Sequence, residues 1–195
     1  TTNSSSKATQ EQFINQAIEF HLKGNISEAA KIYQYYIKQG SIDHRIFSNY
    51  GTILQGLGKL QDAELSCRKA IQIKPEYEQA HSNLGNVLSA LSKLQEAELS
   101  YRKAIQINPN YAEAHSNLGK VLRDLGKLKE AEVSTRKAIE LKPDCAEAHS
   151  NLGNILRDLG KLKEAKLSMR KAIEIKPDFA IAYWNFYRLA NTIDE

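Results

Sequence analysis

The segment 112–145 reads AEAHSNLGKVLRDLGKLKEAEVSTRKAIELKPDC, and the segment 146–179 repeats it at 27 of 34 positions. The start of this motif recurs as AHSNLGNVL at 80–88, and an altered copy, FSNYGTIL, occupies 47–54. Self-similarity at a fixed period of this length is typical of repeat proteins, in which each unit packs mainly on its neighbours. We therefore expect most of the chain to form a single array of similar units.

Small residues and prolines recur along the chain at intervals of 34 residues. They are Gly51, Gly85, Gly119 and Gly153; Ala63, Ala97, Ala131 and Ala165; Ala70, Ala104, Ala138 and Ala172; and Pro75, Pro109, Pro143 and Pro177. Each period also carries two apolar sets with helical spacing. In 112–145 these are Ala114, Leu118, Val121, Leu122 and Leu125, then Leu128, Ala131, Thr135, Ala138 and Ile139. Each period is therefore predicted to form a pair of helices.

Residues that start and stop helices flank these apolar sets. Gly126 is predicted to end the first helix of its period, because glycine tolerates the left-handed backbone found there. Asn110 and Asp144 each precede a glutamate by three residues, which predicts capping boxes at the next first helix. Helices of at most about fifteen residues are rarely stable alone, so we expect their stability to come from packing between neighbours.

The period resembles the tetratricopeptide repeat in its length, its large fourth residue, its small residues at positions 8, 20 and 27, and its proline at position 32. The resemblance covers residues 10–195 and implies an all-α fold, a right-handed α-solenoid of helical hairpins with about eleven helices. The expected parts are a flexible tail at 1–9, repeats at 10–43, 44–77, 78–111, 112–145 and 146–179, and a capping helix at 180–192.

The chain departs from the family pattern at a few positions. His81, His115 and His149 stand where the family often has Trp, and Tyr187 stands where the other repeats have Gly. This tyrosine predicts that no ordinary second helix packs on the last one. The sequence motif HSNLG is similar to the repeats of the O-linked N-acetylglucosamine transferase and to near-consensus bacterial members of the family.

In arrays of this family the sixth residue of each repeat points into a concave groove formed by the first helices. Here that residue is always asparagine: Asn15, Asn49, Asn83, Asn117, Asn151 and Asn185. An amide offers both a donor and an acceptor, so the resemblance implies a ladder that holds the backbone of an extended peptide. The alternative is that these amides form hydrogen bonds within the array.

Neighbouring groove positions vary more and are candidates for setting specificity. The resemblance places Asn86, Lys120 and Asn154 at position 9, and Arg123 and Arg157 at position 12. The C-terminal half of the groove is therefore expected to be more basic and to favour acidic ligands. Asp124 and Asp158 follow the two arginines and are expected to neutralise part of that charge.

The last helix concentrates aromatic residues. Tyr183 and Phe186 occupy positions that face the core, so both are expected to be buried. Trp184 replaces a serine of the other repeats, and Tyr187 has no partner helix to cover it. Exposed aromatic patches usually mark interaction sites, so these two residues are predicted to contact another molecule, with local packing as the alternative.

Other features favour structural explanations. The histidines lie on successive repeats, roughly 10 Å apart, which is too far for shared coordination of zinc. Glu64, Glu98 and Glu132 precede Arg68, Arg102 and Arg136 by four residues, the spacing of solvated surface ion pairs. A chaperone-tail clamp would need lysine where Ser48, Ser82, Ser116 and Ser150 stand. We expect no metal, no cofactor and no catalytic set.

Composition narrows the class of partner. A net charge of +4, spread evenly over the repeats, gives no reason to expect binding to nucleic acid or to a membrane. The cysteines, Cys67 and Cys145, lack metal or disulfide spacing, and Thr1–Gln10 lacks the apolar stretch of a signal peptide. A cytoplasmic protein with free thiols is the simplest expectation.

The function implied by the family resemblance is a protein-interaction scaffold that binds an extended peptide or partner protein in its concave groove, without being an enzyme. Two alternatives remain open. One is a substrate-recruiting array cut from a larger enzyme such as a transferase, which the absence of an initial Met allows. The other is a structural solenoid that self-associates through its C-terminal helix.

Overall fold

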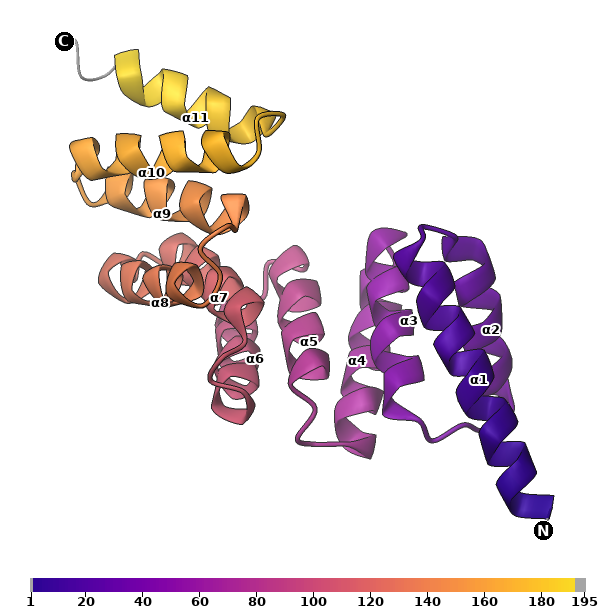
Figure 1. The fold of residues 1–195 in the computed structure, drawn as a ribbon. Coiled ribbons are helices and arrows are strands. Elements are labelled where there is room, and N and C mark those ends of the chain that lie inside the picture. The colour runs from indigo at the N-terminus through magenta and orange to yellow at the C-terminus, as the bar shows by residue number, and fades with distance from the viewer. Residues whose placement is uncertain (1, 192–195) are drawn as a thin grey trace. The chain divides into compact units, whose positions relative to one another are not determined.

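The structure is a computed structural model that describes the backbone of residues 2–191 and the side chains of residues 11–189. This described range contains eleven α-helices and no strand (Figure 1). They are α1 (Thr2–Leu22), α2 (Ile26–Lys38), α3 (His44–Gly56), α4 (Leu60–Ile73), α5 (Glu78–Ala90), α6 (Leu94–Ile107), α7 (Ala112–Asp124), α8 (Leu128–Leu141), α9 (Ala146–Asp158), α10 (Leu162–Ile175) and α11 (Ala180–Asn191). The predicted all-α fold is confirmed.

The chain divides into two compact units, Thr1–Leu91 and Ser92–Glu195. The sequence predicts a single array with a continuous groove and a right-handed coil, and these features stay predictions. Helix α1 begins at Thr2, within the segment 1–9 for which a flexible tail is expected. The boundary between the units falls within the predicted hairpin 78–111, and each unit is described by itself below.

In the first unit, α1 packs on α2 and α3 packs on α4, while α5 lies against both α3 and α4. The core of this unit is apolar and shielded from solvent. It includes Ile14, Ala17, Tyr33, Ile46 and Ile53, all of which are at most 2% exposed. These residues follow the helical spacing of the sequence, so burial of one face of each helix holds the hairpins together.

In the second unit, α6 packs on α7, the pairs α7–α8 and α9–α10 form hairpins, and α11 covers α10 and touches α9. Leu152, Leu156, Met169 and Leu189 form its C-terminal core, and Phe186 packs against them. The expectation that Phe186 belongs to the core is therefore confirmed. Because α11 contributes Leu189, the last helix is an integral part of this unit.

The hairpins 44–77, 112–145 and 146–179 close around a glycine at position 8, where repeat 10–43 has the buried Ala17. A Cβ atom added to Gly119 would collide with the Thr135 side chain and would lie 3.2 Å from the Ala131 carbonyl oxygen. At Gly153 the same atom would lie 2.5 Å from Met169 Cγ and 3.3 Å from the Ala165 carbonyl oxygen. The helices of these two hairpins therefore approach so closely that only glycine fits between them.

The turn after α7 shows why glycine recurs at its position. Gly126 has φ +76°, and its N–H donates to the Arg123 carbonyl at 2.9 Å, while the Lys127 N–H donates to the Leu122 carbonyl at 2.8 Å. This pair of bonds is the Schellman motif, which requires a left-handed residue. At the equivalent position of 78–111, Ser92 has φ +60°. A serine there bears a steric cost of roughly 1–2 kcal/mol.

The predicted capping boxes at Asn110 and Asp144 are wrong. The N-cap residues of α7 and α9 are Tyr111 and Cys145, and neither side chain makes a cap hydrogen bond. The loops are held instead by the histidines at position 4. His115 Nε2 lies 3.0 Å from the Pro109 carbonyl oxygen, and His81 and His149 make the equivalent bonds at 2.8 and 2.9 Å. Each ring nitrogen donates because a carbonyl can only accept.

Candidate protein-binding surfaces

The asparagine row follows the first helices, as expected, but part of it forms bonds within the array. Asn83 on α5 is only 6% exposed, and its Nδ2 donates to Ser48 on α3, 3.0 Å from the hydroxyl and 3.4 Å from the carbonyl oxygen. Asn151 on α9 donates to the Ser116 hydroxyl of α7 at 3.4 Å. These amides join successive first helices through the serine at position 5.

The other members of the row differ in exposure. Asn185 is 7% exposed, Asn49 and Asn117 are half-buried, and Asn15 is exposed. An amide that donates one hydrogen within the array still has its carbonyl oxygen and its second hydrogen available for another bond. When the amide is buried, these groups have little contact with solvent. The role of this row in holding a ligand stays a prediction, and its role in joining neighbouring repeats is observed at Asn83 and Asn151.

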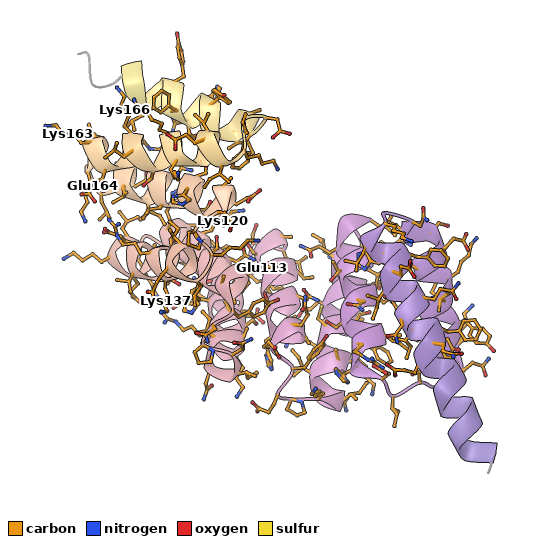
Figure 2. All side chains as sticks on the ribbon, viewed as in Figure 1. Glu113, Lys120, Lys137, Lys163, Glu164 and Lys166 are labelled. Atoms are coloured by element: carbon orange, nitrogen blue, oxygen red, sulfur yellow. The ribbon has the colours of Figure 1, made fainter. Side chains whose placement is uncertain are left out.

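Positions 9 and 12 of α7 and α9 form a polar surface that we call the first-helix face, consisting of Lys120, Arg123, Asn154 and Arg157. Helices α7 and α9 are in contact, so residues at the same repeat positions are neighbours. Lys120 is exposed and has no acidic partner among the described residues (Figure 2). Asn154 is half-buried. Asn86 holds the equivalent place on α5 in the first unit and is also half-buried.

Asp158 binds both arginines of the first-helix face. Its carboxylate accepts from Arg123 Nε at 2.7 Å and from Arg157 at 2.9 Å. Burial opposes ionisation of Asp158, but the hydrogen bonds from Arg123 and Arg157 outweigh it and hold its pKa below the usual value. The expected neutralisation by Asp158 is therefore confirmed, and Lys120 is left as the cation of this face without a counter-charge in the described chain.

Helix α11 exposes most of its aromatic residues. Trp184 is 62% exposed and Tyr187 is 69% exposed, and the Arg188 guanidinium stacks over the Trp184 ring at 4.9 Å. The expectation that Tyr183 is buried is wrong, because it is 48% exposed. In repeat 112–145 the second helix contacts position 4 through the bond from Ser134 Oγ to the His115 carbonyl. No such helix packs on α11 within the described residues.

The second helices are linked by ion pairs that repeat along the second unit. The expected pairs four residues apart are present, including Arg102–Glu98 at 3.0 Å and Arg136–Glu132 at 2.9 Å. Each glutamate also binds a lysine that begins the next second helix, Lys127 at 2.8 Å and Lys161 at 2.9 Å. Sequence reasoning missed these links, although the lysines recur at 34 residues.

Metal sites, membrane-spanning helices and reactive thiols each have requirements to which the described residues can be compared. No group of three or more His, Cys, Asp or Glu side chains is arranged there to hold a metal ion. None of the described helices has both the length and the apolarity needed to cross a bilayer. Cys67 and Cys145 are free thiols, and burial raises the pKa of Cys67 to about 12.

Three family models match the sequence, and together they cover more than half of the chain. Residues 85–126 match a model described as a TPR repeat, and residues 112–145 match one described as a tetratricopeptide repeat. A further tetratricopeptide repeat model matches 44–77 and 146–179. These boundaries coincide with the repeats 44–77, 112–145 and 146–179 predicted from the sequence. No curated protein sequence matches the chain.

Solved structures with the same fold cover nearly all of the chain. TTC0263 from Thermus thermophilus, a thermophilic TPR protein, has 21% identity and a TM-score of 0.77 over 93% of this chain and 98% of its own. YrrB, described as a TPR protein with an unusual peptide-binding site, has 23% identity and a TM-score of 0.68 over 93% and 95%. The APC/C hetero-tetramer Cut9–Hcn1 has 18% identity and a TM-score of 0.86 over 96% of this chain and 38% of that chain. At these identities the likeness concerns the fold.

Proposed function

Because the chain belongs to the tetratricopeptide repeat family, we propose that it is a protein-interaction scaffold whose first-helix face binds an extended, acidic segment of a partner protein. The observation that carries this proposal is the exposed Lys120, which lacks a counter-charge on a face otherwise built from paired arginines and amides. A carboxylate of the ligand would supply that charge. The peptide-binding site of YrrB supports a peptide as the ligand class.

The polar side chains of this face suit recognition of a peptide backbone as well as its acidic side chains. Asn154 offers an amide, and Arg123 and Arg157 are already held in place by Asp158. A pre-positioned arginine loses less conformational freedom when a ligand binds. The same binding role would serve an independent adaptor or an array that recruits substrates to an enzyme.

A peptide-array screen of the purified chain tests the proposal. Immobilised twelve-residue peptides rich in Asp and Glu are compared with peptides in which these residues are replaced by Lys or by Ser. We expect the acidic set to retain the chain most strongly, and Lys120→Glu to weaken retention about tenfold, a change of about 1.4 kcal/mol. Raising the salt concentration should weaken it further.

Lys163→Glu is the matched control, because it makes the same charge change at an exposed lysine of α10, away from the first-helix face (Figure 2). It should leave retention of the acidic peptides unchanged. Equal retention of acidic and serine peptides, or equal loss in both variants, would show that the first-helix face is not the binding site.

A second contact is proposed for α11, where Trp184, Tyr187 and Ile181 are each more than 60% exposed. Replacing Trp184 by Ser and Tyr187 by Gln removes most of this apolar surface. If α11 joins two copies of the chain, light scattering should show an assembly that the variant loses. If the parent is monomeric and the variant keeps its peptide binding, Trp184 and Tyr187 form only the cap of the array.

A further inference from the structure

Two apolar grooves lie side by side on the second helices of the unit Ser92–Glu195. The first, of about 720 Å³, is bounded by α6, α7 and α8 and has Ile105, Leu118 and Val133 among its lining. The second, of about 450 Å³, is lined at the equivalent positions by Ile139, Leu152 and Leu167. Each of these residues in the second groove lies 34 residues after its equivalent in the first. The same groove is therefore present in two successive repeats.

Two polar residues in the lining of the first groove, Ser134 and His115, are engaged in hydrogen bonds to backbone carbonyls. Ser134 at position 23 donates to the His115 carbonyl at 3.0 Å, and His115 at position 4 bonds the Pro109 carbonyl at 3.0 Å. In repeat 10–43 the same two positions carry Phe13 and Ile32, which are larger. A smaller pocket, of about 340 Å³, is lined by Phe13 and Ile32 at that place.

The outer edge of both grooves is apolar and exposed to solvent. Val133 is 71% exposed and Leu167 is 64% exposed, at the same repeat position on α8 and α10. Recurrent exposed apolar residues beside a groove can bury substantial surface against a partner, and such patches usually mark interaction sites. A ligand that covers both grooves would bury both residues.

Charge at the rims indicates what kind of partner fits. The first groove is lined by Arg102, Lys129 and Lys137 but by a single acidic residue, Glu130. Arg102 binds Glu130 at 2.6 Å, whereas no acidic group of the described chain pairs with Lys129. The basic residues that line the second groove, Arg136 and Lys171, bind Glu132 at 2.9 Å and Glu174 at 3.2 Å. Lys137 of the first groove binds Glu140 at 2.6 Å, so Lys129 is the rim residue whose positive charge has no acidic partner in the described chain, and this charge favours an acidic ligand.

We propose that these grooves form a second docking surface, which takes an acidic amphipathic α-helix of a partner protein. Neighbouring grooves are separated by about one helix-packing distance, ~10 Å. Residues two turns apart on a helix, at i and i+7, are ~10.5 Å apart on the same face. The ligand therefore carries two bulky apolar side chains at this spacing, flanked by carboxylates, one of which faces Lys129.

Three synthetic helical peptides test this proposal with the full chain. The first has Leu at i and i+7 and Glu at the flanking positions, the second has Lys in place of each Glu, and the third has Ala in place of each Leu. Fluorescence anisotropy should show the first binding at least about tenfold more tightly than the other two. Failure of the first to bind below about 1 mM, or similar affinity for all three, overturns the proposal.

Variants locate the peptide on the chain. Val133→Glu and Leu167→Glu should each weaken binding of the first peptide about fivefold or more, because each places a carboxylate beside a groove. Leu65→Glu is the matched control: Leu65 has the same repeat position and 68% exposure but lines neither groove. All three positions are exposed, so the fold should survive, as circular dichroism will check.

The two proposed surfaces can fail independently. Binding that is lost in Lys120→Glu but unaffected in Val133→Glu would place this peptide on the first-helix face and overturn the second docking surface. Loss in Val133→Glu and Leu167→Glu, with Lys120→Glu and Leu65→Glu unaffected, is the result expected if the grooves are a separate site.

Discussion

At the scale of single residues, the space around position 8 decides how closely two helices of a hairpin can approach. Any side chain at Gly119 would meet Thr135 and the Ala131 carbonyl oxygen, whereas a Cβ atom at Gly56 would meet nothing within 4 Å. Gly56 lies at the end of α3, and Gly119 lies in the middle of α7. A side chain is therefore expected to be tolerated at Gly56 but not at Gly119.

Replacing Gly119 by Ala should lower the free energy of unfolding by ~1–3 kcal/mol, because the added methyl group overpacks the contact between α7 and α8. Replacing Gly56 by Ala should be neutral or stabilising, since alanine is the better helix former by up to about 1 kcal/mol. Urea unfolding of both variants measures the difference. Equal stability of the two would contradict the close packing described for Gly119.

Ser92 is the residue whose backbone is least suited to its side chain. Its equivalents in the other repeats are Gly24, Gly58, Gly126 and Gly160, each with a positive φ. Ser92→Gly should raise the melting temperature by about 2–4 °C, corresponding to roughly 1 kcal/mol of relieved steric cost. The reverse exchange, Gly126→Ser, should lower it by a similar amount. An unchanged or lower melting temperature for Ser92→Gly would show that the position does not carry this strain.

At the scale of secondary structure elements, side-chain hydrogen bonds supplement apolar packing between first helices. Asn83 ties α5 to α3 through Ser48, which is fully buried. Asn151 ties α9 to α7 through Ser116. Bonds of this kind fix the register of one helix against the next, because they form only when the two repeat positions align.

Asn83→Ala should destabilise the chain by about 1 kcal/mol, the net value of a typical hydrogen bond, while leaving Ser48 without its amide partner. Adding Ser48→Ala should cost less than the sum of the two single changes, with a coupling energy of ~0.5–1.5 kcal/mol. A double-mutant cycle by urea unfolding provides the measurement. Strict additivity would mean that the two residues do not interact in solution.

At the scale of the whole molecule, ion-paired carboxylates should make stability depend on pH. Burial opposes ionisation of Glu98, but hydrogen bonds from Lys127 and Arg102 outweigh it and lower its pKa. The bond from Lys161 lowers the pKa of Glu132, followed by that from Arg136. Both side chains are at most 14% exposed, so these pairs are less screened than ordinary surface pairs.

A carboxyl group with a lowered pKa stabilises the fold fully above its unfolded pKa, about 4.3, and loses that contribution as the pH falls through its folded value. Glu132→Gln should therefore be less stable than the parent at pH 7 by about 0.5–1 kcal/mol and equally stable below both pKa values. Glu174→Gln, in an exposed pair with Lys171, should differ little at either pH. Thermal unfolding at several pH values checks this, and a deficit that persists in acid would contradict it.

The repeat in the sequence determined the secondary structure because each element depends on local spacing. Apolar residues at helical intervals, Gly126 at a turn and Gly119 at a helix contact all act within one hairpin. The candidate first-helix residues could be predicted from their repeat positions. The role of His115 could not, because its bond to the Pro109 carbonyl depends on where the preceding loop lies.

Only the tertiary structure decided which polar groups are used inside the array and which remain for partners. Asn83 and Lys120 occupy first-helix positions of the same kind in the sequence, yet one amide is buried against Ser48 and one ammonium is exposed. The grooves beside Val133 and Leu167 likewise arise where three successive helices meet, α6 to α8 in one case and α8 to α10 in the other. Spacing along the chain fixes which face of a helix a residue occupies, but burial depends on what packs against that face.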